Sequence, residues 1–550
     1  MSEALCFLSA AELQAGIRGK DISPVELMDA VLARAARLQP GLNCFITLCA
    51  DEAMAAARAA EQDVMAGRPL APLHGSPFTV KDIVNTRGVR TTFGAVPMRG
   101  NVPGEDAVAV ARLRAQGAIL VGKTTTPEFG PKCLTDSPLF GRTRNAWHAQ
   151  RTSGGAAVAV ASGIAPLAVA TDGGGSTRIP AACNGVVGIK QSQGVIPHSQ
   201  AQDLFGNQTY VTPTTRTVMD TALMMQAMAG EHPCDPWSLG VPAADYVAAA
   251  QPHGDLRGVR IRYCLAPPGH AVATDVAAAF EASLERLREL GAVLEPFSGD
   301  GFEVEPIWRA INHTVWRTRF APIVAQHREA LSATFVRQVE SAAHVTGMEY
   351  QQAMFERSKL FLRVQGLLAD AELLAMPTLT RTALPLDQDL FGQIEIDGQL
   401  YDNVRASWFP WTMPFNMTGH PAISLPWQDG VHRAIAAVHD LSADLQEARL
   451  RRRQASRSSL RRASGSYLIC PGFAPEGASH FCPSGKSNQK RVYGPAGGHS
   501  YRSGLRLSYG AWLRCRAGLP DALVRHGGSG LTPLLNEPRA VGWPLLLAAT

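Results

Sequence analysis

A serine stands directly behind three glycines in residues 171–180, which read TDGGGSTRIP. Glycines reach backbone conformations that other residues avoid, and they bring consecutive N–H groups close to a ligand. Such amides can stabilise an oxyanion while a serine at their end attacks a carbonyl carbon. The run predicts a nucleophile at Ser176 and an oxyanion hole built from the backbone of Gly173, Gly174 and Gly175. Taken alone, the run would more simply be a glycine-rich surface turn.

Two upstream segments contain the side chains that such a serine needs. Residues 75–82 (GSPFTVKD) form an apolar run that ends in Lys81. Burial lowers the pKa of a lysine, so a lysine behind an apolar strand can act as a general base in its neutral form. Residues 153–159 (SGGAAVA) begin a helix of small residues. Taken alone, Lys81 would more simply be a surface lysine at a strand end that pairs with Asp82.

These three segments together resemble the amidase signature family, whose members hydrolyse carboxamides with a Ser–cis-Ser–Lys triad. The resemblance covers residues 5–426 and includes four further blocks, which are residues 122–130, 136–141, 181–190 and 414–426. It implies an amidase that forms an acyl-enzyme at Ser176 with Lys81 as the base, and that releases ammonia or an amine. It also implies a small-molecule amide substrate, no cofactor and no metal, and it is compatible with a homodimer.

The loop that carries the relay serine in the family is shortened here. The resemblance implies a Gly-Gly-Ser-Ser-Gly-Gly loop whose first serine passes the proton from the nucleophile to the lysine. This chain reads RTSGG over residues 151–155, and the four residues of the usual Pro-Gly-Gly-Ser run are missing. Counted back from Ser176, Ser153 takes the position of the second serine and Thr152 that of the relay. Three alternatives follow: Thr152 offers its hydroxyl, Ser153 shifts into the relay position, or the chain is a catalytically impaired amidase-like protein.

Asp172 and Arg178 flank the predicted nucleophile. An ion pair that holds the glycine-rich backbone is the favoured interpretation, and direct contact with the substrate is the alternative. The tripeptide Arg-Ile-Pro over residues 178–180 resembles stand-alone amidases. The amidase-like subunit of the tRNA-dependent amidotransferase, which donates ammonia to a partner, usually has Arg-Gln-Pro there and is the alternative function.

The other chemistry-bearing residues indicate no metal site. The ten cysteines show no CxxC pair, and the fifteen histidines show no HxxxH or HxH spacing. Scattered cysteines without a secretory signal predict reduced thiols and a cytoplasmic protein, and no apolar run is long enough for a membrane span. Five aromatic residues are candidates for pocket lining, although ordinary core packing is the simpler interpretation of each: Phe129, Phe205, Trp308, Trp316 and Trp408.

Short apolar runs alternate with helical segments, which predicts an α/β fold with a sheet covered by helices on both faces. The amidase-signature fold that the resemblance implies has a central mixed sheet, and residues 330–370 read as a helical covering subregion. Strands are expected at residues 78–80, 118–121 and 167–170, and helices at 50–65, 106–116, 215–230 and 273–291. Capping boxes are expected at Ser9–Glu12 and Ser23–Glu26.

The chain changes character at about Trp427. The formal net charge of the 550 residues is +5, but residues 427–550 contain 17 Lys and Arg against 7 Asp and Glu, whereas residues 1–426 contain 35 against 40. We expect a C-terminally incomplete amidase signature domain over 1–426 and a basic tail over 427–550 that is disordered or derives from a reading-frame change. An arginine-rich run over 449–457 is the candidate for nucleic-acid binding, but the disordered extension is favoured.

Overall fold

The computed structural model describes residues 2–251, 255–426 and 546–549. All of them belong to one structural unit. Apart from residues 546–549, the predicted tail lies outside the described residues, and so does its arginine-rich run.

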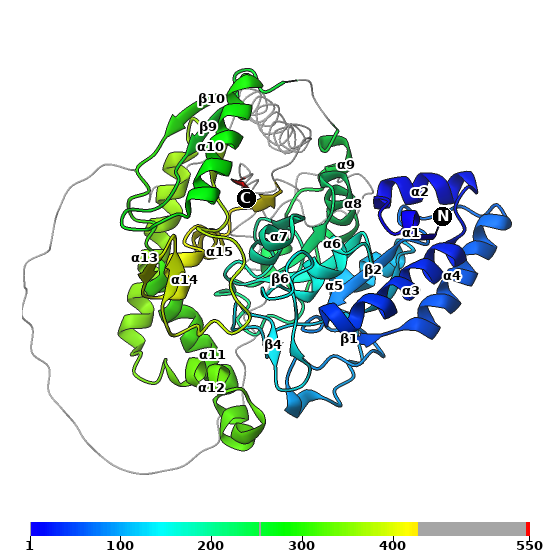
Figure 1. The fold of residues 1–550 in the computed structure, drawn as a ribbon, viewed down its shortest axis with the longest axis horizontal. Coiled ribbons are helices and arrows are strands. Elements are labelled where there is room, and N and C mark those ends of the chain that lie inside the picture. Colours follow the sequence, from blue (N-terminus) through cyan, green and yellow to red (C-terminus); the bar gives the residue numbers. More distant parts are fainter. Residues whose placement is uncertain (1, 252–254, 427–545, 550) are drawn as a thin grey trace, which may run out of the picture. The chain divides into compact units, whose positions relative to one another are not determined.

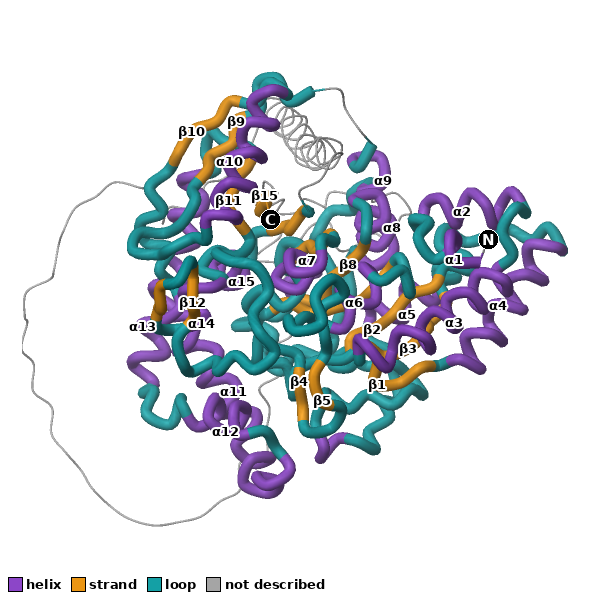
Figure 2. Tube along the Cα trace, in the orientation of Figure 1, coloured by secondary structure: helices purple, strands orange, loops and turns teal. Residues whose placement is uncertain are grey.

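An eleven-stranded mixed sheet forms the centre of this unit, which confirms the predicted fold class (Figure 1). In sheet order the strands are β1 (Phe45–Leu48), β3 (Ile119–Thr124), β2 (Pro77–Lys81), β6 (Leu167–Asp172), β8 (Tyr210–Thr215), β7 (Val187–Lys190), β14 (Ala422–Leu425), β15 (Leu546–Ala549), β11 (Leu373–Pro377), β9 (Arg260–Tyr263) and β10 (Val293–Pro296). The three strands expected from apolar runs are β2, β3 and β6. They are parallel neighbours, and Figure 2 shows β2 and β3 side by side.

The two faces of the sheet are covered by different helices because strand side chains alternate in direction. In β6, Leu167 and Val169 belong to the core cluster that includes α5 (Val108–Ala115) and α8 (Val218–Met228). Ala168 and Ala170 instead pack with α6 (Gly155–Ala161) and α7 (Arg178–Asn184). The helices α6 and α7 begin just after the two loops that are predicted to be catalytic, and they contact each other. This face of the sheet therefore carries both loops.

The N-terminal helices are α1 (Ser2–Leu5), α2 (Ala10–Gly19), α3 (Pro24–Leu42) and α4 (Ala50–Met65). The capping box before α2 is confirmed, because the Ser9 hydroxyl accepts from the Glu12 N–H and the Glu12 carboxylate accepts from the Ser9 N–H. The box predicted before α3 is wrong. Ser23 does accept from the amide of Glu26, but its hydroxyl donates to Glu61, and Glu26 makes no return bond among the described residues.

The predicted helical covering subregion is present and begins earlier than residue 330. It contains α11 (Glu305–His327), α12 (Ala333–Glu340) and α13 (Gly347–Leu367), and both later helices pack against α11 (Figure 1). The short helices α14 (Val404–Trp408) and α15 (Thr412–Thr418) share its core. We call these five helices the covering region, and α11 and α15 are the parts of it that reach the glycine loop.

The remaining elements are α9 (Tyr246–Ala249), α10 (Thr274–Glu289), the 3₁₀ turns η1 (Val96–Met98), η2 (Pro236–Ser238) and η3 (Arg328–Ala330), and the two-stranded pairs β4 (Asp136–Ser137) with β5 (Gly141–Arg142) and β12 (Ile394–Ile396) with β13 (Gln399–Tyr401). Within the described ranges, no helix combines the length and the apolar character needed to cross a membrane. The seven cysteines in those ranges are all free thiols.

Candidate active site

Ser176 lies in the turn between β6 and α7, and the residue before it has to be glycine. Gly175 has a φ of 127°, a conformation that favours glycine. A Cβ at this position would lie 2.6 Å from the Thr412 hydroxyl of α15. The backbone conformation and the close approach of the covering region both explain the glycine before the predicted nucleophile.

The buried side chain of Asp172 supports this turn through hydrogen bonds and an ion pair. Its buried carboxylate accepts from the Arg178 guanidinium at 2.9 and 3.0 Å, from the Gly175 N–H at 2.7 Å and from the Asn416 amide at 2.9 Å. Burial raises the pKa of Asp172, but the charge and hydrogen bonds of Arg178 and the bond from Asn416 outweigh it and hold the pKa at about 2. Neither Asp172 nor Arg178 lines the cavity that contains Ser176. The two residues therefore form an ion pair that supports the turn.

Three side chains of the covering region hold successive carbonyl groups of the turn: Asn416 bonds to Asp172 O at 3.0 Å, Trp308 to Gly173 O at 3.1 Å and Thr412 to Gly174 O at 2.6 Å. The N–H of Gly175 already donates to Asp172. The N–H groups of Gly173, Gly174 and Ser176 have no acceptor among the described residues. The Gly175 N–H is therefore engaged, whereas the N–H groups of Gly173, Gly174 and Ser176 are available to a ligand in the described structure.

Lys81 lies at the end of β2, next to the strand that leads to Ser176. Its side chain is buried, and its ammonium donates to the Thr171 hydroxyl at 3.0 Å. Burial lowers the pKa of Lys81 to about 8, although the nearby Asp172 raises it. The carboxylate of Asp82 bonds to Thr92 instead, so the alternative of a surface lysine paired with Asp82 is wrong. A lysine with this pKa is poised to act as a general base.

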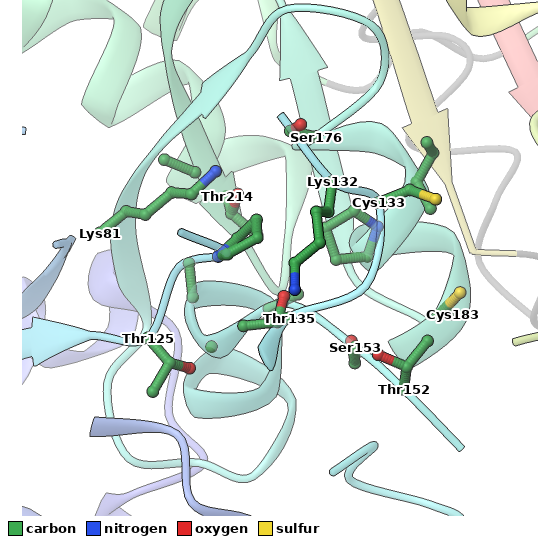
Figure 3. A pocket seen from close by; sticks show the side chains of 18 of the residues that line it. Lys81, Thr125, Lys132, Cys133, Thr135, Thr152, Ser153, Ser176, Cys183 and Thr214 are labelled. Atoms are coloured by element: carbon green, nitrogen blue, oxygen red, sulfur yellow. The ribbon is translucent and has the colours of Figure 1, made fainter. Parts of the chain in front are cut away.

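Lys81 and Ser176 line one small cavity of about 30 Å³ (Figure 3). In Figure 3, Lys81 and Ser176 lie towards one end of the lining side chains, and Thr152 and Ser153 lie towards the other end. The side chain of Lys132 lies between the two pairs. A cavity of this size has room for about one water molecule, whereas small-molecule sites usually exceed about 300 Å³. The cavity in this conformation is therefore smaller than a small-molecule amide.

The shortened loop is anchored away from the base and the nucleophile. The Thr152 N–H donates to Leu384 O at 2.9 Å, and the Ser153 hydroxyl accepts from the Asn184 side chain of α7. In the part of the chain that the structure describes, no hydrogen bond joins Thr152 or Ser153 to Lys81 or Ser176, and every peptide bond is trans. In this conformation the hydroxyl that Lys81 contacts is that of Thr171.

Sequence reasoning missed several side chains around the site. Thr171 precedes Asp172 in the motif itself, and Asn416 lies in the block 414–426, but neither received a role. Lys132 lines the cavity, is 4% exposed and forms an ion pair with Asp136, and no sequence signal pointed to it.

The five aromatic candidates for pocket lining differ in their outcome. Trp408 lines the cavity, and Trp308 contacts the glycine turn. Phe129 is buried among other phenylalanines and Trp316 packs on Trp308, as core residues do. Phe205 is 74% exposed, so core packing is the wrong interpretation for it.

Two thiols also line the cavity, and neither is set up as a nucleophile. Burial raises the pKa of Cys133 to about 11 and that of Cys183 to about 12, so both remain protonated near neutral pH. Across the described residues, no three His, Cys, Asp or Glu side chains are grouped as metal ligands. Among the residues that line the cavity, Ser176 keeps the position that the sequence predicts for the nucleophile.

Comparison with known proteins agrees with this chemistry. The family model described as Amidase matches residues 26–433, past the predicted boundary at 426. An acylamidase from Rhodococcus erythropolis is 34% identical over 442 residues, which is 77% of this chain and 89% of that protein. A glutamyl-tRNA(Gln) amidotransferase subunit from Acidothermus cellulolyticus is 38% identical over 299 residues, which is 54% of this chain and 59% of that protein.

Solved structures show the same fold over most of the chain. A bacterial aryl acylamidase of the amidase signature family matches with a TM-score of 0.70 and 26% identity over 78% of this chain and 94% of its own. The peptide amidase from Stenotrophomonas maltophilia matches with a TM-score of 0.65 and 25% identity over 79% of this chain and 96% of its own. The chain therefore belongs to the amidase signature family of enzymes that hydrolyse the C–N bonds of amides.

Proposed function

We propose that the chain hydrolyses a carboxamide to a carboxylate and ammonia or an amine through an acyl-enzyme at Ser176. The observation that carries this proposal is that the buried Lys81 and Ser176 line the same cavity. Beside Ser176, the glycine turn holds amide N–H groups without an acceptor among the described residues.

Each residue has one task in this reaction. Neutral Lys81 takes the proton from the Ser176 hydroxyl as its oxygen attacks the amide carbon. The N–H groups of Gly173, Gly174 and Ser176 bind the oxyanion of the tetrahedral intermediate. The proton then passes to the leaving nitrogen, the C–N bond breaks, and Ser176 holds the acyl group as an ester. A water molecule, activated in the same way, attacks the ester, and the carboxylate leaves.

The proton path between Lys81 and Ser176 needs one more group in the structure's conformation. A water molecule in the cavity supplies it, or Thr152 or Ser153 moves into the path when substrate binds. The bond from Asn184 to Ser153 opposes such a movement. That bond favours the second candidate, a catalytically impaired amidase-like protein, because loss of one member of a cooperating set can remove most of the rate.

We propose an N-acylated amine, which is a secondary amide, as the substrate class, because one sequence relative is named an acylamidase and one structural relative an aryl acylamidase. The alternative function, that of an amidotransferase subunit, would need glutamine as its substrate, and glutamine carries an ammonium group. No Asp or Glu lines the described cavity to pair with that ammonium. A cytoplasmic location and a homodimer belong to the same proposal, and the free thiols of the described cysteines support the first.

Covalent labelling of Ser176 tests the proposal without knowledge of the substrate. The purified chain is treated with a fluorophosphonate and its intact mass is measured, with Ser176→Ala and Ser153→Ala as matched variants and circular dichroism to verify folding. We expect one adduct in the wild type and in Ser153→Ala, and none in Ser176→Ala. A folded wild type without an adduct would favour the impaired protein.

A further inference from the structure

Trp308 of α11 is in direct contact with the glycine turn. Its indole is 4% exposed, and its Nε1–H donates to Gly173 O at 3.1 Å. The ring also lies against the next residue, since a Cβ added to Gly174 would lie 2.8 Å from Trp308 Cζ2. A side chain from the covering region therefore sets both the position and the hydrogen bonding of this peptide.

The same contact fixes the direction of the following N–H group. The carbonyl of Gly173 and the N–H of Gly174 belong to one planar trans peptide and point in opposite directions. While Trp308 holds the carbonyl, the Gly174 N–H must point away from the indole. That N–H has no acceptor among the described residues, so it is available to a ligand.

The indole itself has little freedom to move. Trp316 packs edge-on against it at 5.7 Å, and His313 does so at 6.3 Å between ring centroids. The Arg405 guanidinium lies 5.8 Å from the Trp308 ring centroid. A donor held on several sides can orient a peptide without reorganisation during the reaction.

We propose that Trp308 is a positioning residue for the oxyanion hole, which orients the Gly173–Gly174 peptide so that the Gly174 N–H meets the oxyanion. This inference rests on the proposed acyl-enzyme at Ser176. It separates Trp308 from Thr412, which holds the next carbonyl, because the N–H of that peptide belongs to Gly175 and already donates to Asp172. The covering region thus contributes Trp308 to transition-state binding, in addition to packing on the core.

The test replaces the indole by a ring without the N–H. We expect Trp308→Phe to lower kcat on an anilide about tenfold, with KM within about twofold. A misdirected donor should cost less than a deleted one, which lowers kcat by about 10²–10³. The rate of fluorophosphonate labelling and the affinity for a trifluoromethyl ketone inhibitor should fall by the same factor as kcat/KM. Trp316→Phe is the matched control, because it changes a ring that packs on Trp308 but makes no bond to the turn, and it should lower all three values less than Trp308→Phe does.

The outcomes separate this inference from the proposed function. A folded wild type that is not labelled contradicts both. If Trp308→Phe is labelled as fast as a labelled wild type, the positioning role alone is overturned. The same holds if Trp316→Phe loses as much kcat as Trp308→Phe, because the effect would then come from packing. If Trp308→Phe does not fold, Trp308→His, which keeps a ring N–H, should retain more kcat than Trp308→Leu; equal losses in these two variants would overturn the proposal.

Discussion

The two loops that should carry catalysis differ in how their serines are held. Both loops lead into seven-residue helices on the same face of the sheet, α7 after Ser176 and α6 after Ser153. The turn at Ser176 is held by buried side chains, and its own hydroxyl makes no hydrogen bond in the described structure. In the loop 151–155 the Ser153 hydroxyl is engaged by Asn184. The turn of the proposed nucleophile is thus preorganised, whereas the serine of the loop predicted to be shortened is engaged by another side chain.

The difference teaches that a loop can keep its backbone pairing while its serine hydroxyl is held away from Lys81 and Ser176. The shortened loop retains backbone pairing, with bridges from Thr152 to Arg144 and from Arg151 to Pro385. Loop length changes folding free energy only slowly, by roughly 0.6 kcal/mol per doubling. The reaction rate is much more sensitive to the loop geometry, because a displacement of about 1 Å in a catalytic group can cost about 10²-fold in rate.

The largest effect is expected from breaking the support of the Ser176 turn. Asp172→Ala leaves the Arg178 guanidinium, which is 2% exposed, buried without its carboxylate. Removal of one partner of a buried pair costs about 3–5 kcal/mol of unfolding free energy, measured here by urea denaturation. Asp63→Ala, which breaks the exposed pair with Arg68, is the control and should cost less than about 1 kcal/mol. Equal losses in the two variants would show that the Ser176 turn is not locked by this pair.

The second effect concerns the shortened loop directly. Insertion of Pro-Gly-Gly-Ser between Thr152 and Ser153 restores the run that the family resemblance implies, and it should raise kcat by about 10²-fold, within the range of about 10²–10⁴ that a positioned proton-transfer group contributes. The matched control inserts Pro-Gly-Gly-Ala, which restores the length without the hydroxyl. If both insertions lower kcat, the short loop is the working form and water carries the proton.

The sequence predicted the parts of the site that depend on local patterns. The glycine run before Ser176 and the apolar run before Lys81 are contiguous, so the motif, strands β2 and β6 and the mixed sheet could be predicted. Trp308, Thr412 and Asn416 reach the turn from more than 130 positions away, and only the folded chain brings them there. The bond from the Gly175 N–H to Asp172 also depends on the folded turn, so the sequence alone could not show which amides of the glycine run lack an acceptor.

The pH dependence of kcat/KM tests the other catalytic partner in this comparison, the proposed base Lys81. Burial lowers the pKa of Lys81 to about 8, and only the neutral amine can accept the proton. As the pH falls through 8, Lys81 becomes protonated, so kcat/KM should fall about tenfold per pH unit below 8 and level off above it. Initial rates between pH 6 and pH 10 on a non-ionising N-acylated amine measure this. A flat profile across that range would remove Lys81 from the role of base.

The smallest effect is expected from Ser153→Ala, and it tests whether the engaged hydroxyl takes part in the reaction. In the conformation described, Ser153 bonds to Asn184 and not to Lys81 or Ser176. Its loss should therefore cost about 1 kcal/mol of unfolding free energy and change kcat less than about threefold. A matched Asn184→Ala variant frees the Ser153 hydroxyl without removing it. If Ser153→Ala lowered kcat more than about 10²-fold while Asn184→Ala raised it, Ser153 would be the relay, and the bond to Asn184 would be what restrains the enzyme.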